Sequence, residues 1–216
     1  MPYDLCLFDL DGTLTDPKIG MLKAYQYSLA AFGIEEDYEF MTRFIGPPLR
    51  DNFRKHYGFS EADTEKAVAI YREYLSETGI HETFMYPQIP EILQELSGKG
   101  VTLAVATSKA DYYAEQTLKQ FDLEKYFVRL FADTMEGSLT KNGKQEIVRI
   151  ALDELDPERK MSAVMIGDRE HDIIAAIANS IDSIGITWGY GSQAELESAG
   201  ATWIADSATA LCSLVL

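Results

Sequence analysis

Hydrophobic residues along this chain form short continuous runs in some places and helical periodicities in others. Tyr3–Leu10 is a short, largely apolar run that ends at Asp11, which predicts a buried strand leading into a tight turn. Between residues 16 and 82, apolar positions such as Leu22, Tyr25 and Leu29 recur every three or four residues, which is typical of helices. A mostly helical block is therefore predicted directly after the first strand.

Beyond residue 87 the pattern alternates between strands and helices. Such alternation favours right-handed crossovers and a mostly parallel sheet that is covered on both faces. We therefore predict an α/β fold, with a Rossmann-like core built from residues 1–15 and 83–216 and an inserted helical domain at residues 16–82. The predicted strands of the second part are 101–106, 130–132, 162–166, 183–187 and 202–204, and the predicted helices are 90–99, 110–121, 144–155, 172–179, one opened by the capping-box sequence at 192–195, and the last ten residues.

Composition narrows the classes of partner. Of 216 residues, 46% are hydrophobic, which is enough to bury a sizeable core. The 35 acidic residues outnumber the 19 basic ones and give a net charge of -16, which repels nucleic acid polymers and anionic membrane surfaces. A small phosphorylated metabolite remains compatible, because local cations reverse the field inside one cleft. We expect such a metabolite as partner, no nucleic acid polymer, no membrane, and a monomer or homodimer.

The two cysteines indicate a reducing compartment. Cys6 lies in the first apolar run and Cys212 near the C-terminus, with neither metal-type spacing nor a disulfide framework. We expect both to be buried small hydrophobes. The first residues carry no basic stretch followed by a long apolar one, and no apolar run approaches membrane-spanning length. The expected location is the cytoplasm.

Candidate chemistry lies just after the predicted strands, because ligands of open parallel sheets bind beyond the carboxyl ends of the strands. Asp9 and Asp11 lie two residues apart, so their side chains can face one ligand. A carboxylate nucleophile can take a phosphoryl group as an aspartyl-phosphate, and a second carboxyl group can protonate the leaving group and then activate water. An ordinary Asp-Gly turn is the alternative interpretation of Asp11-Gly12 alone.

The stretch Asp9-Leu10-Asp11-Gly12-Thr13-Leu14-Thr15 resembles the first motif of the haloacid dehalogenase superfamily, in its phosphatase branch. The resemblance implies a haloacid dehalogenase-like fold, with Asp9 as nucleophile and Asp11 as general acid and base.

The sequence Thr107-Ser108-Lys109, directly after a predicted strand, resembles the second motif of that superfamily. In the second motif a hydroxyl group and neighbouring amides bind phosphate oxygens, so we expect these three residues to bind substrate phosphate. A helix starting just afterwards would also direct its N-terminal amides at an anion. A plain helix N-cap is the alternative interpretation of Thr107.

The third motif of the superfamily is a lysine that neutralises the nucleophile and the transferred phosphoryl group, an arrangement that favours the transition state. Lys144, at the start of a predicted helix, matches this motif best, and Lys141 competes with it from three residues away. The sequence departs from phosphoglycolate phosphatases at two points, with Ser108 where asparagine is common and without the frequent Lys-Pro pair at Lys144.

The fourth motif corresponds to Gly167-Asp168-Arg169-Glu170-His171-Asp172, a Gly-Asp-x-x-x-Asp sequence after a predicted buried strand. Hard oxygen ligands suit Mg²⁺, which binds through one or two carboxylates, waters and substrate phosphate. By resemblance, Asp9, Asp168 and the backbone carbonyl of Asp11 bind Mg²⁺, and Asp172 supports the metal site from behind these direct ligands or through water. Helix capping is the structural alternative for Asp168 and Asp172, and His171 is interpreted as an ordinary residue.

In this superfamily a helical block between the first and second motifs resembles a mobile cap that excludes water during phosphoryl transfer. The stretch Phe44–Arg50 resembles the cap loop of phosphoglycolate phosphatase-like enzymes. Arg50 or Arg43 could then meet an anionic leaving group, with a surface turn carrying solvated arginines as the alternative.

These motifs together predict a Mg²⁺-dependent phosphatase that hydrolyses a small phosphate monoester, of the phosphoglycolate or 5′-nucleotide type, through an aspartyl-phosphate on Asp9. Three alternatives remain open: a phosphosugar mutase on the same scaffold, a metal-independent dehalogenase, and an inactive binding protein that retains the fold.

Overall fold

The computed structural model describes residues 2–141 and 143–216, and the chain divides into two compact units. One unit comprises residues 1–15 and 85–216, and the other comprises Asp16–Phe84. The expected boundaries, at 15/16 and 82/83, lie next to these divisions. Each unit is described here by itself. The short strands β2 (Thr15–Asp16) and β3 (Phe84–Met85) pair where the chain passes from one unit to the other.

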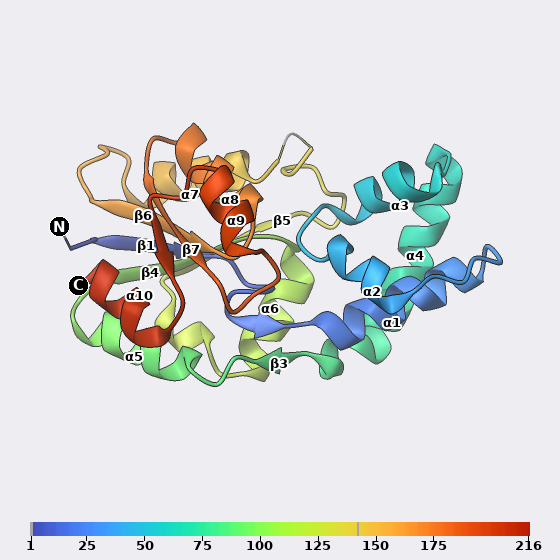
Figure 1. Ribbon diagram of the computed structural model, residues 1–216, viewed down its shortest axis with the longest axis horizontal. Helices are drawn as coiled ribbons and strands as arrows, with labels where there is room; N and C mark the ends of the chain where they lie inside the picture. The colour runs from blue at the N-terminus through green and yellow to red at the C-terminus, as the bar shows by residue number, and fades with distance from the viewer. Residues whose placement is uncertain (1, 142) are drawn as a thin grey trace. The chain divides into compact units, whose positions relative to one another are not determined.

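The larger unit contains a six-stranded sheet in the order β5-β4-β1-β6-β7-β8, and every pair in it is parallel (Figure 1). The first strand lies in the middle because later strands add on both of its sides, which confirms the predicted α/β class. The strands are β1 (Leu5–Phe8), β4 (Thr102–Ala110), β5 (Arg129–Asp133), β6 (Ala163–Gly167), β7 (Asp182–Ile186) and β8 (Trp203–Ala205).

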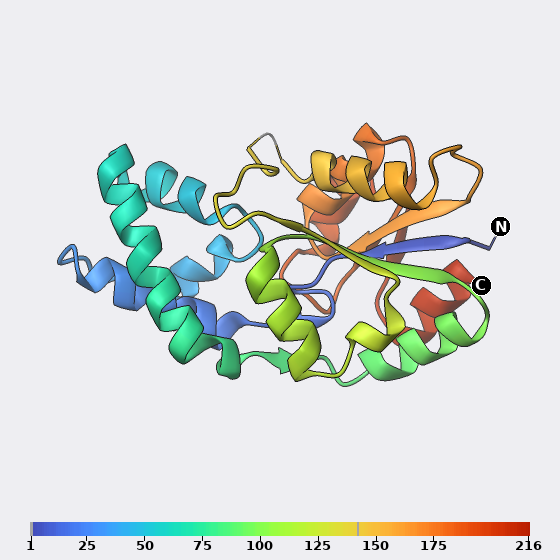
Figure 2. The same cartoon turned by 180° about the vertical axis from the view of Figure 1, so that it is seen from behind.

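Helices cover both faces of this sheet (Figures 1 and 2), as right-handed crossovers require. Helices α7, α8 and α9 lie on one face, and α5, α6 and α10 lie on the other. Residues of β1 point alternately to the two sides, so Leu5 and Leu7 join one buried cluster while Cys6 and Phe8 join the other. The helices are α5 (Ile89–Gly98), α6 (Asp111–Gln120), η3 (Glu124–Tyr126), α7 (Gln145–Leu155), α8 (Glu170–Ala178), α9 (Gln193–Ser198) and α10 (Ala208–Val215).

The largest difference from the predicted elements is the length of β4, which continues to Ala110 rather than ending at residue 106. Its pairing with β5 shifts register between Thr107 and Ala110, so the whole second motif belongs to an irregular strand end. The residue before α6 is Ala110, and no side chain caps this helix. The interpretation of Thr107 as a helix N-cap is therefore wrong.

The inserted unit is helical and has an aromatic core of its own. The ring of Tyr25 lies 4.8–5.5 Å from those of Phe44, Phe53 and Tyr71, and Asn52 donates hydrogen bonds to the Tyr25 hydroxyl and the Phe44 carbonyl. The buried side-chain amide of Asn52 therefore connects α3 to α1 and to the segment that precedes α3. The helices are α1 (Lys18–Ala30), α2 (Tyr38–Met41), η1 (Thr42–Phe44), α3 (Leu49–Tyr57), α4 (Glu61–Glu77) and η2 (Gly79–Glu82).

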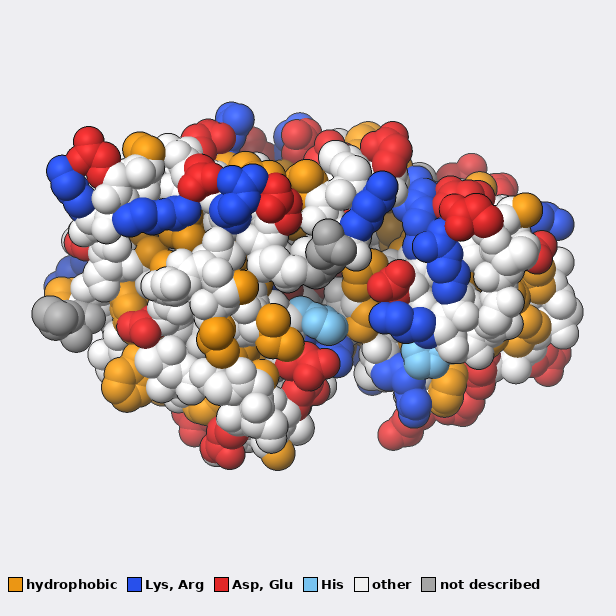
Figure 3. Space-filling view, turned by 90° about the horizontal axis from the view of Figure 1, so that it is seen from above, with side chains coloured by type: hydrophobic (Ala, Val, Ile, Leu, Met, Phe, Trp, Pro, Cys, Tyr) orange, Lys and Arg blue, Asp and Glu red, His pale blue; other side chains and the backbone are white. Residues whose placement is uncertain are grey.

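Two observations bear on the predicted partners. Acidic and basic side chains are interspersed on the face shown in Figure 3, and no uniformly basic surface of the kind that binds nucleic acid covers it. Within residues 2–141 and 143–216, the helices are too short or too polar to cross a membrane. Both cysteines are buried, as predicted.

Two isoleucines test the contribution of the sheet core. Ile184 on β7 has no exposed surface, whereas Ile174 on α8 is 47% exposed. Ile184→Ala removes buried methyl groups and should lower the free energy of unfolding by about 2–5 kcal/mol, whereas Ile174→Ala should change it by about 0.5 kcal/mol or less. Urea unfolding measures both values, and equal losses would contradict the assignment of Ile184 to the core.

Candidate active site

The candidate site forms where β1 and β6 end side by side. Phe8 pairs with Ile166 in the parallel register, and the Asp9 amide donates to the Ile166 carbonyl at 2.9 Å. The next residues of the two strands, Asp9 on one and Gly167-Asp168 on the other, therefore leave the sheet at the same edge. Two aspartates that are 159 positions apart in the sequence become neighbours through this register.

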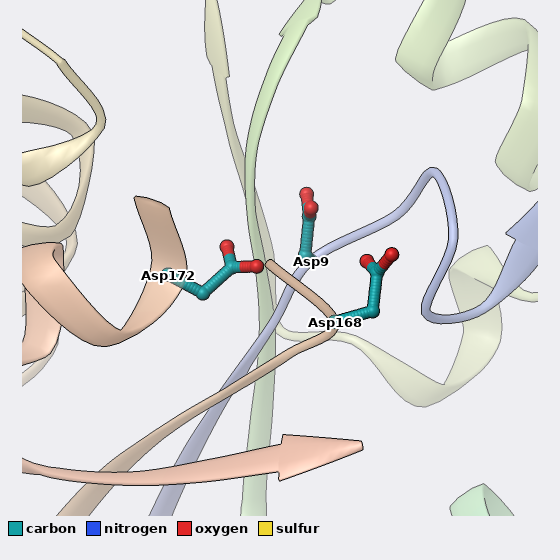
Figure 4. A group of neighbouring side chains, drawn as sticks. All are labelled: Asp9, Asp168 and Asp172. Atoms are coloured by element: carbon teal, nitrogen blue, oxygen red, sulfur yellow. The ribbon is translucent and has the colours of Figure 1, made fainter. Parts of the chain in front are cut away.

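Three aspartates form a buried cluster at this edge (Figure 4). Asp9 follows β1, Asp168 follows β6, and Asp172 lies in the first turn of α8. One carboxylate oxygen of each lies within 4.8 Å of the other two. The exposed fractions of these residues are 8%, 0% and 1%, so water screens their mutual repulsion poorly.

Lys144, the residue before α7, extends its side chain into the cluster. Its ammonium nitrogen lies 2.7 Å from Asp9 Oδ1 and 2.6 Å from Asp172 Oδ1. Burial alone would lower the pKa of Lys144, but the carboxylates of Asp172 and Asp9 outweigh it and raise this pKa. Lys144 therefore stays charged and bridges the nucleophile candidate and α8. Lys141 is exposed.

The site holds more carboxyl groups than ammonium groups. Burial, reinforced by the neighbouring Asp172 and Asp9, raises the pKa of Asp168 to about 8. When ionised, the four carboxylates of Asp9, Asp11, Asp168 and Asp172 face two ammonium groups, an excess of two negative charges. A divalent cation would balance this excess, and a set of oxygen donors alone suits a hard cation such as Mg²⁺.

Asp11 forms the second ion pair of the site. Lys109 Nζ lies 2.8 and 2.9 Å from the two carboxylate oxygens of Asp11. Burial raises the pKa of Asp11, and the positive charge of Lys109 opposes that rise. The chain turns at Gly12, where φ is +88° and an added Cβ would lie 2.3 Å from an oxygen of Asp168. The Asp-Gly pair is thus a turn that also brings the chain against Asp168.

The rest of the second motif lies at the same sheet edge. β4 pairs with β1 so that Phe8 faces Val105, and Thr107 follows two residues later. Thr107 is 1% exposed and accepts a weak hydrogen bond from the Lys109 amide at 3.3 Å. Ser108 is half-buried.

Asp172 also has the capping role considered as an alternative. Its Oδ2 accepts from the Arg169 amide at 3.1 Å while its Oδ1 faces Lys144. The Asp172 carboxylate therefore both caps the N-terminus of α8 and forms an ion pair with Lys144. His171 is half-buried beside it, and burial lowers its pKa, which keeps it neutral at pH 7.

The loop after β7 was missed in the sequence analysis. The Tyr190 amide donates to Asp168 Oδ2 at 2.8 Å, and Thr13 Oγ1 donates to Asp168 Oδ1 at 3.1 Å. The Trp188 indole in turn donates to the Thr13 carbonyl. The loop thus supplies one donor to Asp168 directly and contacts Thr13, which supplies the other. The available signal was the Trp-Gly-Tyr-Gly sequence directly after a predicted strand, at the edge where ligands bind.

The predicted cap arginines belong to the inserted unit. Arg50 makes a two-pronged salt bridge to Glu65, at 2.7 and 2.9 Å. Arg43 donates to the Phe40 carbonyl and lies 4.1 Å from the centre of the Phe40 ring. Both guanidinium groups therefore have partners within this unit.

Comparison with known proteins identifies the class. Residues 6–186 match the family described as haloacid dehalogenase-like hydrolase. The chain is 41% identical to a 5′-nucleotidase of Pseudomonas aeruginosa, over 90% of this chain and 87% of that protein. It is 34% identical to the tyrosine-protein kinase PtkA of Mycobacterium tuberculosis, over 95% and 69%, and 29% identical to a phosphoglycolate phosphatase of Agrobacterium fabrum, over 86% and 81%.

A solved structure, described as a predicted phosphatase from Clostridium acetobutylicum, superposes with a TM-score of 0.92 at 39% identity and covers 100% of this chain and 99% of its own. The protein is therefore a hydrolase with a strand-end aspartate site. It belongs to the haloacid dehalogenase-like hydrolases and is a phosphatase, a phosphoric monoester hydrolase. The resemblance stated from its motifs is confirmed.

The packing around Asp168 generates a test. A Cβ at Gly189 would lie 2.4 Å from both Asp168 Cβ and the Gly12 carbonyl oxygen. Gly189→Ala should therefore displace Asp168, lower the free energy of unfolding by about 1–3 kcal/mol and reduce phosphatase activity. Gly98→Ala is the matched control, since nothing lies within 4 Å of its added Cβ. Thermal unfolding and phosphate release would be measured on both, and a fully active Gly189→Ala protein would contradict this packing.

Proposed function

We propose that this phosphatase is Mg²⁺-dependent and works through an aspartyl-phosphate on Asp9. The observation that supports this most directly is the buried ammonium group of Lys144, 2.7 Å from Asp9 Oδ1. A carboxylate must approach an anionic phosphate ester to attack it, and a fixed positive charge between them reduces that repulsion. This geometry supports the assignment of the third motif to Lys144 rather than Lys141.

In the first half-reaction, Asp9 attacks phosphorus while the bond to the leaving oxygen breaks, and Asp11 gives that oxygen a proton. In the second, Asp11 takes a proton from water as the water oxygen attacks phosphorus and Asp9 is released. Thr107 and Ser108 bind the phosphate oxygens in this proposal, and Lys144 holds Asp9 in place through both steps.

The residues present fit Mg²⁺. Asp9, Asp168 and the Asp11 carbonyl would bind it, and Asp172, which also contacts Lys144 and the Arg169 amide, would support it through water. A bound Mg²⁺ supplies charge neutralisation and orients the transferred phosphoryl group. Tyr190 and Thr13 hold Asp168 ready for this role, since its two donors fix both oxygens.

The inserted unit, Asp16–Phe84, is proposed to act as the cap during turnover, with Arg50 as the candidate contact for an anionic leaving group. The guanidinium group of Arg50 forms a salt bridge with Glu65. To contact a leaving group, Arg50 would therefore have to break this salt bridge first.

A 5′-nucleotide is the favoured substrate. The relative named 5′-nucleotidase is 41% identical to this chain, whereas the one named phosphoglycolate phosphatase is 29% identical. Phosphoglycolate is the second candidate. A panel of nucleoside monophosphates, phosphoglycolate, sugar phosphates and pyrophosphate distinguishes them by kcat/KM, and phosphate release that requires a sugar bisphosphate would instead indicate a mutase.

Replacing the nucleophile tests the mechanism. Asp9→Asn should lower phosphate release by at least about 10³-fold, whereas the exposed Asp206→Asn should leave it unchanged. Borohydride treatment of wild-type protein quenched during turnover should convert residue 9 to homoserine, which mass spectrometry detects. Homoserine at another aspartate, or full activity of Asp9→Asn, would contradict the role of Asp9.

Mg²⁺ binding is testable without an activity assay. At a concentration about 100-fold above its dissociation constant, Mg²⁺ should stabilise chelator-treated protein by about 2.7 kcal/mol, which corresponds to a rise in Tm of about 5–10 °C. Asp168→Asn should abolish this rise and Asp206→Asn should keep it. A rise that persists in Asp168→Asn would place the cation elsewhere.

A further inference from the structure

Lys109 was predicted to bind substrate phosphate, but its ammonium group is engaged elsewhere. It contacts both carboxylate oxygens of Asp11, at 2.8 and 2.9 Å, and the two side chains are 10% and 13% exposed. At an exposed site such a pair would contribute little. Here both groups have lost most of their water, so each depends on the other for its solvation.

We propose that Lys109 is a positioning residue for the general acid and base: it orients the Asp11 carboxyl group and does not bind the transferred phosphate. This assignment rests on the proposed function, since it gives Asp11 the proton-transfer role.

Backbone geometry supports the assignment. Lys109 lies at the irregular end of β4, where the register with β5 shifts between Thr107 and Ala110. Its amide is held by Thr107 Oγ1 at 3.3 Å, so the strand end that carries the phosphate-binding hydroxyl also carries the lysine. Asp11 lies opposite in the turn that Gly12 permits. These two segments are 98 positions apart in sequence, and this ion pair of side chains links them.

The division of charge supports it as well. Lys144 already lies between Asp9 and Asp172, so the attacking carboxylate has its own cation. Asp11 has Lys109. A carboxyl group that rotates freely presents its oxygens in many directions, whereas one whose two oxygens both contact an ammonium group is held in a single orientation. Misplacing a reacting group by about 1 Å costs on the order of 100-fold in rate.

The leaving group distinguishes this role from phosphate binding. p-Nitrophenolate is a stable anion that departs without a proton, whereas an alkoxide from a nucleotide or sugar phosphate requires one. The value of kcat/KM reports the steps up to departure of the leaving group. A residue that acts through the acid therefore affects alkyl phosphates selectively, and a ligand of the transferred phosphate affects both substrates equally.

The experiment compares Lys109→Met, Lys109→Arg and Asp11→Asn with wild type, on p-nitrophenyl phosphate and on the alkyl phosphate that the enzyme hydrolyses best. Lys109→Met should lower kcat/KM for the alkyl phosphate by about 10- to 100-fold and for p-nitrophenyl phosphate by about 3-fold or less. Inhibition by inorganic phosphate should be unchanged. Lys109→Arg, which keeps a two-pronged donor, should recover most of the loss. Adding Lys109→Met to Asp11→Asn should change the rate by about 2-fold or less, because the two act as one unit.

Equal losses on the two substrates, or an inhibition constant for inorganic phosphate raised about 10-fold, would overturn the proposal in favour of direct phosphate binding. Additive effects of Lys109→Met and Asp11→Asn would overturn it as well. Lys119→Met, which removes an exposed lysine on α6, controls for charge, and thermal unfolding of each variant controls for folding. A different result would contradict the proposed function itself: Asp9→Asn and Asp11→Asn proteins that are each as active as wild type.

Discussion

The burial of several carboxylates at one edge of a parallel sheet is the constraint on which the rest of this structure depends. Asp168 has no exposed surface, and its pKa is raised to about 8 by burial and by its acidic neighbours. Such a cluster is costly unless positive charge enters it. Lys144 supplies that charge by contacting Asp9 and Asp172 together, and the remaining excess suits a divalent cation. The charges of the site itself therefore favour binding of a metal ion.

The fold meets this constraint with backbone rather than with additional side chains. Parallel register brings the ends of β1, β4 and β6 together, so residues from distant parts of the sequence meet at one edge of the sheet. The loop after β7 then closes around Asp168, where Gly189 and Gly12 approach so closely that neither tolerates a side chain. The Tyr190 amide completes the arrangement. A site built from strand ends and tight turns holds its carboxylates in place before any ligand arrives.

The sequence was sufficient for the elements and the chemistry that local patterns encode. Buried strands followed by aspartates predicted the sheet class and the residues that form the cluster. The sequence was insufficient where tertiary structure determines which groups contact each other. The donor to Asp168 is a backbone amide, which no side-chain pattern reveals. Likewise, the extension of β4 through Lys109 arises from pairing with β5, whereas the apolar run alone ended this strand at residue 106.

The two buried lysines show why residue type does not settle a role. Both are ammonium groups at the same edge of one sheet, and both belong to motifs associated with phosphate. Lys144 bridges two carboxylates from different elements, so its removal would leave Asp9 and the first turn of α8 without a counter-charge. Lys109 serves one carboxylate through both of its oxygens, so its influence passes through Asp11. The chemistry that each lysine affects is set by its partner, and the partner is set by where its strand or helix ends.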